Sequence, residues 1–172
     1  MDESGFSQRP PIRATWAPRG QTPCLIEPFN WERVSGIGAV LASPDGWRTR
    51  WLLALHRGGI GSRHVVRFLN HLKGHRRRPV ILLWDGLTAH RSRLTRQALR
   101  HHRDWLRLQP LPAYAPELNP VEQLWAHLDA TALANTPAED LERLSRRVRR
   151  GLGRVRRTPY LGRAFLRHAG LF

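Results

Sequence analysis

The sequence predicts an α/β domain in which a mixed sheet carries helices on its faces. Three observations predict it: a strand–turn–strand pattern over residues 34–55, a continuous apolar run at 80–84, and segments of helical spacing after each. The order hairpin, helix, strand, helix, strand, helices is typical of layered α/β domains. At 172 residues we expect one domain over 1–172.

The first half of the chain is expected to form an arm, a hairpin and a helix. Residues 7–23 are rich in Pro, Arg and Gly, which predicts an arm without a core element. Strands at 34–42 and 47–55 flank Ser43-Pro-Asp-Gly46, a turn in which Pro presets φ and Gly accepts a positive φ. Ser62 is the predicted N-cap of the following helix. Its inward residues recur at helical spacing: Val65, Phe68, Leu69 and Leu72.

Two strands and a helix follow. Val80–Trp84 is apolar throughout, which predicts a strand buried on both faces that ends at Asp85-Gly86. Residues 92–102 predict a helix with Leu94, Ala98 and Leu99 inward, and residues 105–111 alternate as a strand does.

The C-terminal part predicts helices, including a basic helical region over 136–172. Asn119-Pro-Val-Glu122 has the pattern of a helix start, with Asn as N-cap and Pro at the first helical position. Thr136-Pro-Ala-Glu139 repeats it for a last long helix. The predicted inward residues are Val121, Leu124, Trp125 and Leu128 in the first helix, and Leu141, Leu144, Val148 and Leu152 in the second.

The charge balance predicts a polyanionic partner. The chain carries 29 Lys+Arg against 13 Asp+Glu, a net charge of +16, and nucleic acid is the first candidate. A single cysteine, Cys24, excludes a disulfide framework and a thiolate metal site. No apolar run is long enough to span a membrane. We therefore expect a cytoplasmic, nucleoid-associated protein.

Three separated acids are the candidate catalytic residues. Asp85 ends a buried strand, where open α/β sheets place their ligands, Glu122 lies in the first turn of a helix, and Asp2 is a third oxygen ligand. Such ligands suit Mg²⁺ or Mn²⁺, and a pair of ions can activate a phosphodiester. Each acid has a simpler reading: Glu122 as a capping residue, Asp85 as a turn residue, Asp2 as part of a disordered terminus.

Basic residues supply the predicted DNA contacts. One face of the last long helix carries Arg143, Arg146, Arg147, Arg149 and Arg150, which favours phosphate contact over an ordinary solvated face. His90 can assist a metal or a phosphate, although a polar residue that simply flanks a helix is the favoured reading. The full set of predicted DNA contacts is Arg19, His90, Arg91, Arg146, Arg147, Arg149 and Arg150.

Four motifs, in order, resemble the DDE transposases of bacterial insertion sequences in the mariner-like branch of the retroviral-integrase superfamily. They are Asp2-Glu-Ser-Gly-Phe6, Thr15-Trp-Ala-Pro-Arg-Gly-Gln-Thr-Pro23, Trp84-Asp-Gly-Leu-Thr-Ala-His90 and Leu111-Pro-Ala-Tyr-Ala-Pro-Glu-Leu-Asn-Pro-Val-Glu-Gln-Leu-Trp125. The resemblance implies an RNase H-like fold, a metal triad of Asp2, Asp85 and Glu122, and two Mg²⁺ ions, with Mn²⁺ as a substitute. It also implies cleavage of element ends and transfer to target DNA, and by analogy a homodimer that inserts at TA.

The chain also departs from that family's pattern. Relatives carry an N-terminal helix-turn-helix region, which we expect this chain to lack, so an upstream half is an expected partner. The first strand is expected to be largely missing, which would leave Asp2 unsupported. Two alternatives to an active transposase domain therefore stay open: an inactive remnant that binds DNA non-specifically, and a nuclease of RNase H type.

Overall fold

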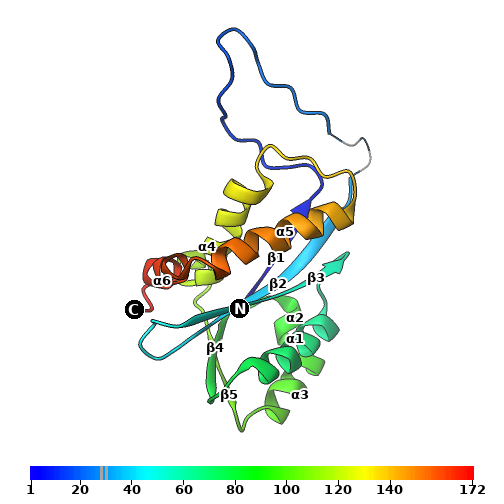
Figure 1. Ribbon diagram of the computed structural model, residues 1–172. Helices are drawn as coiled ribbons and strands as arrows, with labels where there is room; N and C mark the ends of the chain where they lie inside the picture. The colour runs from blue at the N-terminus through cyan, green and yellow to red at the C-terminus, as the bar shows by residue number, and fades with distance from the viewer. Residues whose placement is uncertain (28, 30) are drawn as a thin grey trace.

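The strands form two small sheets. The computed structural model describes residues 1–27, 29 and 31–172. A three-stranded antiparallel sheet has the order β1 (Asp2–Ser7), β2 (Arg33–Ala42), β3 (Thr49–Arg57), and a two-stranded parallel sheet pairs β4 (Val80–Trp84) with β5 (Leu106–Pro110). The Met1 nitrogen donates to the Leu83 carbonyl at 2.9 Å, so the sheets meet where β1 adjoins β4 (Figure 1). The expected mixed sheet is thus present in two parts.

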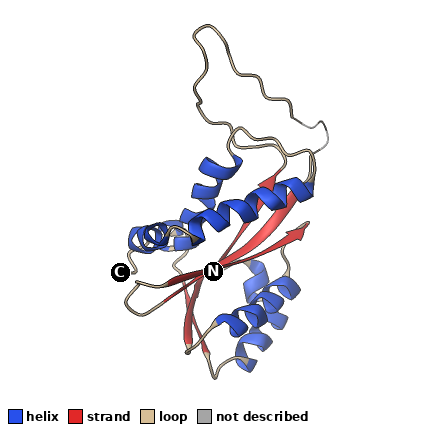
Figure 2. Cartoon of the chain, in the orientation of Figure 1, coloured by secondary structure: helices blue, strands red, loops and turns tan. Residues whose placement is uncertain are grey.

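Helices lie on both sides of the three-stranded sheet (Figures 1 and 2). On one side are α4, α5 and α6, and on the other are α1, α2 and α3. The helices are α1 (Ser62–His75), α2 (Thr88–Arg91), α3 (Arg93–His101), α4 (Pro120–Leu128), α5 (Leu141–Arg156) and α6 (Pro159–His168). A 3₁₀ turn, Pro116–Leu118, precedes α4, and a π-helical turn, Asp129–Leu133, follows it.

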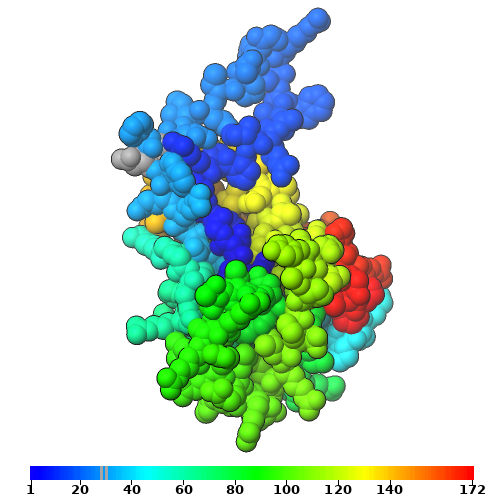
Figure 3. Space-filling view, turned by 180° about the vertical axis from the view of Figure 1, so that it is seen from behind, coloured from blue at the N-terminus to red at the C-terminus, as the bar shows by residue number. Residues whose placement is uncertain are grey.

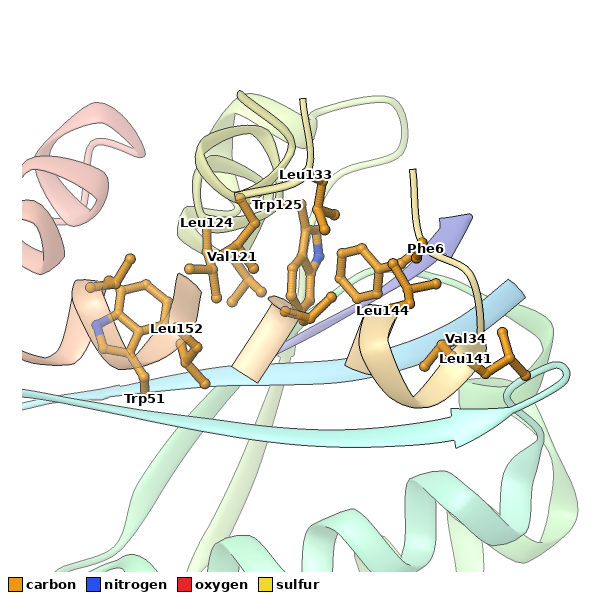
Figure 4. Close-up of a cluster of buried hydrophobic side chains, with 14 of the residues drawn as sticks. Phe6, Val34, Trp51, Val121, Leu124, Trp125, Leu133, Leu141, Leu144 and Leu152 are labelled. Atoms are coloured by element: carbon orange, nitrogen blue, oxygen red, sulfur yellow. The ribbon is translucent and has the colours of Figure 1, made fainter. Parts of the chain in front are cut away.

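Alternation along β2 builds a core on each face of the sheet. Val34 faces α5 in the first core, where Phe6 packs edge-on to Trp125 with ring centroids 5.6 Å apart (Figure 4). Ile37 faces α1 in the second core, which also contains Trp84. Each strand is therefore fixed in register, because a slip of one residue would exchange the two faces.

The first strand is present, which corrects the expectation that it is largely missing. Asp2 is the first residue of β1 and pairs with Gly38 of β2, and the pairing continues to Ser7 opposite Arg33. Phe6 anchors the strand because its ring is buried in the first core. Asp2 is consequently held by a paired strand, and its reading as part of a disordered terminus is wrong.

Other sequence predictions hold for the main elements and fail at their edges. The hairpin turn is confirmed, with Gly46 at φ 68°, and Asn119 caps α4 through Val121 N–H. All eight inward residues predicted for α4 and α5 are buried, as are the four of α1.

Four details are corrected. Gly61, not Ser62, is the N-cap of α1, because the His64 ring accepts from its N–H. The last long helix begins at Leu141, where Asp140 accepts from Arg143 N–H, so residues 136–139 are loop. Ile81 was expected to be buried but is 68% exposed, because β4 lies in a two-stranded sheet. Leu94 was expected to face inward but is 42% exposed, because Thr95 takes the inward position of α3.

The predicted arm lies outside the body of the domain. Residues 9–27 contain no helix or strand and extend away from the body (Figures 1 and 3). Gln8 closes the base of the arm, because its side chain accepts from Glu32 N–H at 2.6 Å and donates to the Ala138 and Glu139 carbonyls. Across the described residues, no helix combines the length and apolar character that crossing a membrane requires.

Candidate active site

Asp85 lies where the sequence places it, directly after β4. Its Oδ1 accepts from Leu87 N–H at 3.2 Å, which closes a short turn at the end of the strand. The turn leads into α2, and the guanidinium of Arg91 lies against the backbone of Gly86, in space that a Cβ there would need. The interpretation of Asp85 as a turn residue is therefore correct. Its carboxylate is nevertheless 41% exposed, so it remains accessible to a ligand.

Asp2 is tied to α4 by a buried hydrogen bond. The indole N–H of Trp125 donates to Asp2 Oδ2 at 2.8 Å, and only 4% of Asp2 is exposed. Trp125 follows Glu122 by three residues, so both side chains lie on one face of the helix. The bond therefore brings the first turn of α4, with Glu122, beside the start of β1.

Glu122 is the least constrained of the three acids. Within the described chain its carboxylate makes no side-chain hydrogen bond, while Asn119 caps the helix. The reading of Glu122 as a reciprocal capping residue thus has no support in the contacts, and the carboxylate lines the cleft instead.

One cleft of about 930 Å³ brings the three acids together. Asp2, Asp85 and Glu122 all line it, from β1, the end of β4 and the first turn of α4. Its other walls are the turn and helices after Asp85 and the loop from β5 to α4. In the space-filling view, the dark blue N-terminal segment lies between the green and yellow-green segments that carry these walls (Figure 3).

Burial and neighbouring acids raise the pKa values of Asp2 and Glu122. Burial is the largest cause that raises the pKa of Asp2, to about 7, and the charge of Glu122 adds to it, while the Trp125 hydrogen bond opposes it. Burial and then the charge of Asp85 raise the pKa of Glu122. Glu122 thus lies between two carboxylates that repel it, and a divalent cation in the cleft would relieve this repulsion.

The donor set fits Mg²⁺ or Mn²⁺. All three predicted ligands are carboxylates, the donors that these hard cations prefer, and the cleft leaves room for water and phosphate oxygens. A second set of possible metal ligands shares Asp85 with the first. Glu3, Asp85 and His90 each place one donor atom within 4.8 Å of the others.

His90 is not placed as a DNA contact. Its side chain is 2% exposed, Nε2 lies 2.9 Å from Glu3 Oε1, and Nδ1 lies 3.0 Å from Asp85 Oδ1. Burial acts to lower the pKa of His90, but the Glu3 hydrogen bond and charge, together with Asp85, raise it above its ordinary value. Nδ1 also hydrogen-bonds the Asp85 backbone carbonyl at 3.1 Å. With both ring nitrogens engaged, the predicted phosphate contact is corrected to a bridge between Glu3 and Asp85.

The predicted arginine contacts separate into three groups. Arg91 is exposed at the wall of the cleft, and Arg19 is exposed in the arm. On α5, Arg146 pairs with Glu142, and Arg147 donates to the Thr136 carbonyl and, at 2.7 Å, to the Pro137 carbonyl. Arg149 and Arg150 are exposed and have no ion pair within the described residues.

Sequence reasoning missed several residues at the cleft. Glu3 follows Asp2 in a strand, so alternation sends its side chain to the other face, and nothing in the sequence indicates His90 as its partner. Trp125 was expected only as a core residue, although a buried indole N–H generally needs an acceptor. Arg96 and the fully exposed Tyr114, at φ 58°, also line the cleft.

Comparison with known proteins identifies the family. The family described as DDE superfamily endonuclease matches residues 1–145. An insertion element IS630 uncharacterized 39 kDa protein from Shigella sonnei is 28% identical over 163 residues, which are 94% of this chain and 45% of that protein. The chain thus spans about half the length of this relative.

Solved structures show the same fold. The Mos1 strand transfer complex superposes with a TM-score of 0.62 at 16% identity, over 98% of this chain and 52% of that one. The Mos1 mariner paired-end complex with Mn gives 0.62 at 18% identity, over 98% and 51%. The expected RNase H-like α/β fold is confirmed. The chain belongs to the DDE superfamily endonucleases.

Proposed function

We propose that this chain is the catalytic domain of a transposase, which cleaves DNA strands at element ends and joins them to target DNA with divalent metal. One observation carries the proposal: carboxylates from β1, β4 and α4 converge on a single cleft in a chain of net charge +16. The basic surface attracts DNA, and in the acidic cleft bound cations can join phosphate to protein.

In this proposal the three acids have different tasks. Asp2, Asp85 and Glu122 hold two Mg²⁺ ions, or Mn²⁺ in their place. The bound ions supply Lewis-acid activation of a water or of a 3′-hydroxyl at the phosphodiester. Trp125 fixes the orientation of Asp2 through its 2.8 Å hydrogen bond. Glu122, whose carboxylate makes no such bond among the described residues, would be free to bind the metal directly. Arg91 and Arg96, at the cleft wall, neutralise phosphates beside the scissile one.

The partners are proposed from the family. We propose that the chain binds element ends and target DNA, acts as a homodimer near the nucleoid in the cytoplasm, and works with a helix-turn-helix half that recognises the ends. The likeness to Mos1 complexes with a transposon end supports the DNA partner. The +16 charge supports sequence-independent phosphate contact.

The alternative is an inactive remnant that binds DNA. The structure no longer gives a reason to favour it. It rested on an unsupported Asp2, whereas Asp2 is paired in β1 and bonded to Trp125. A nuclease of RNase H type shares the metal chemistry and differs in substrate, so cleavage of RNA–DNA hybrids by the chain would favour it.

Nicking of supercoiled plasmid tests the proposal. We expect the purified chain to nick DNA with Mg²⁺ or Mn²⁺ and to stop in EDTA. Asp2→Asn, Asp85→Asn and Glu122→Gln should each lower the rate at least about a hundredfold, since each removes a metal-holding charge. Glu117→Gln is the matched control, because Glu117 is exposed just before α4 and outside the cleft lining. Binding without nicking would support the remnant, and nicking unchanged in all three variants would exclude the assigned site.

A further inference from the structure

A buried histidine joins the segments that carry two of the three acids. His90 contacts Glu3, the residue after Asp2, at 2.9 Å through Nε2. Its Nδ1 hydrogen-bonds the Asp85 backbone carbonyl at 3.1 Å and lies 3.0 Å from Asp85 Oδ1. Its ring stacks on Trp84 with centroids 4.2 Å apart and planes 3° from parallel. The stacking holds the ring in the one plane that serves both contacts.

This bridge spans the junction of the two sheets. The three-stranded and two-stranded sheets share no strand pairing. Between β1 and the end of β4, the hydrogen bonds found among the described residues are Met1 to Leu83 and those of His90. The spacing of Asp2 from Asp85 therefore depends on few polar contacts, and His90 makes those closest to the carboxylates.

Alternation along β1 gives the two acids of that strand separate anchors. Asp2 and Glu3 are neighbours in the strand, so their side chains leave it on opposite faces. Trp125 of α4 holds Asp2, and His90 holds Glu3. Glu3 is 8% exposed at its side chain, and its Oε2 has no hydrogen-bond partner among the described residues, so the His90 contact is its main polar compensation there.

We propose that His90 is a positioning residue, which holds Asp85 at a fixed place relative to Asp2: Nδ1 binds the Asp85 backbone carbonyl beside the carboxylate, and the second ring nitrogen is anchored on Glu3. The proposal rests on the proposed function, in which Asp2 and Asp85 hold the same metal centre. His90 acts through Asp85 and touches neither metal nor DNA. Its nitrogens lie on opposite edges of the ring and each faces a carboxylate, so ligating a metal would break one contact.

Two substitutions of His90 separate its contact with Asp85 from its contact with Glu3. In Asn, the side-chain amide lies near the position of Nδ1, so His90→Asn can still donate to Asp85 but cannot reach Glu3. In Gln, the amide lies near the position of Nε2, so His90→Gln keeps the Glu3 contact and loses Asp85. Groups that orient metal ligands typically contribute about ten- to a hundredfold in metal affinity.

The experiment measures Mn²⁺ binding to the purified chain by electron paramagnetic resonance at pH 8, beside its nicking rate. We expect His90→Gln to lower Mn²⁺ affinity about tenfold or more, and His90→Asn to recover most of that loss. His102→Gln is the matched control, because His102 is also buried but bonds Asn70 outside the cleft lining. Equal affinity of His90→Gln and the wild type, or equal losses in the Asn and Gln variants, would overturn the proposal.

Spectroscopy separates positioning from ligation. Electron spin echo modulation of bound Mn²⁺ should show no nitrogen of a coordinated imidazole, and its presence would overturn the proposal in favour of a ligand role. Because the His90→Asn change leaves Glu3 unpaired, this variant is also tested together with Glu3→Gln, which removes the buried charge. Asp85→Asn tells the two failures apart: if it binds Mn²⁺ as the wild type does, the proposed metal site itself is wrong.

Discussion

At the scale of single residues, Asp2 destabilises the metal-free fold at neutral pH. Its pKa is about 7 in the folded chain against 3.8 ordinarily, so the folded state binds the proton more tightly. Stability should therefore fall as pH rises from about 4 to 7 and level off above. We expect the stability of Asp2→Asn relative to the wild type to rise by on the order of 4 kcal/mol from pH 4 to pH 8, measured by thermal unfolding in EDTA.

A surface acid provides the control for this prediction. Asp104→Asn, in the exposed turn before β5, should leave the pH profile unchanged. If Asp2→Asn shows the same pH dependence as the wild type, the carboxylate is ionised without cost and the repulsive site is wrongly described.

The three acids could be predicted from the sequence, and their supports could not. Asp85 and Glu122 stand beside local signals, a strand end and a helix cap, that fix where they lie. The contacts from Trp125 to Asp2 and from His90 to Glu3 join residues far apart in the chain. No local periodicity encodes such pairs, because they depend on how the two sheets and α4 meet.

At the scale of elements, the seating of α4 on β2 depends on Gly38. A Cβ at Gly38 would come within 2.7 Å of Trp125 Cζ2 and 3.2 Å of Val121 Cγ1, both in the packed core. We expect Gly38→Ala to destabilise the chain by about 1–3 kcal/mol, since overpacking shifts the helix. The shift also moves the indole from Asp2, so Mn²⁺ affinity should fall with stability.

Gly5→Ala is the matched control for this packing. Gly5 is also a strand glycine, in β1, but a Cβ there meets nothing within 4 Å. Urea unfolding of the two variants should separate them clearly. Equal effects would mean that strand propensity, rather than the contact with Trp125, explains the loss.

The start of a helix was predicted correctly where one capping signal acts. It was predicted wrongly where two capping signals lie close together. Asn119 and Pro120 agree on the start of α4, and the structure follows them. Thr136-Pro-Ala-Glu139 has the same pattern, but Asp140 four residues later caps α5 with its own carboxylate. Ala138 is instead held by Gln8, because its N–H donates to the Gln8 carbonyl at 3.1 Å. Residues 136–139 therefore pack against the base of the arm as a loop and do not form the first turn of the helix.

At the scale of the whole molecule, the +16 charge predicts DNA binding that weakens steeply with salt, and α5 shows which arginines matter. Arg143 and Arg146 are engaged by Glu139 and Glu142, whereas Arg149 and Arg150 are exposed without an ion pair in the described chain. Replacing Arg149 and Arg150 together by Ala should therefore lower affinity at every salt concentration and reduce the slope of log K against log salt by about 2.

The paired arginines supply a control of equal charge. The double variant Arg143→Ala, Arg146→Ala also removes two positive charges. It breaks the ion pairs with Glu139 and Glu142, whereas the Arg149 and Arg150 variant is expected to remove direct phosphate contacts. We expect its change in slope, by fluorescence anisotropy with random duplex DNA from about 50 to 300 mM salt, to be the smaller one. Equal slopes in the two double variants would mean that DNA responds to the net charge of the domain and not to this face of α5. An unchanged slope in both would make the face a solvated one, and would leave Arg91 and Arg96 at the cleft as the contacts to test next.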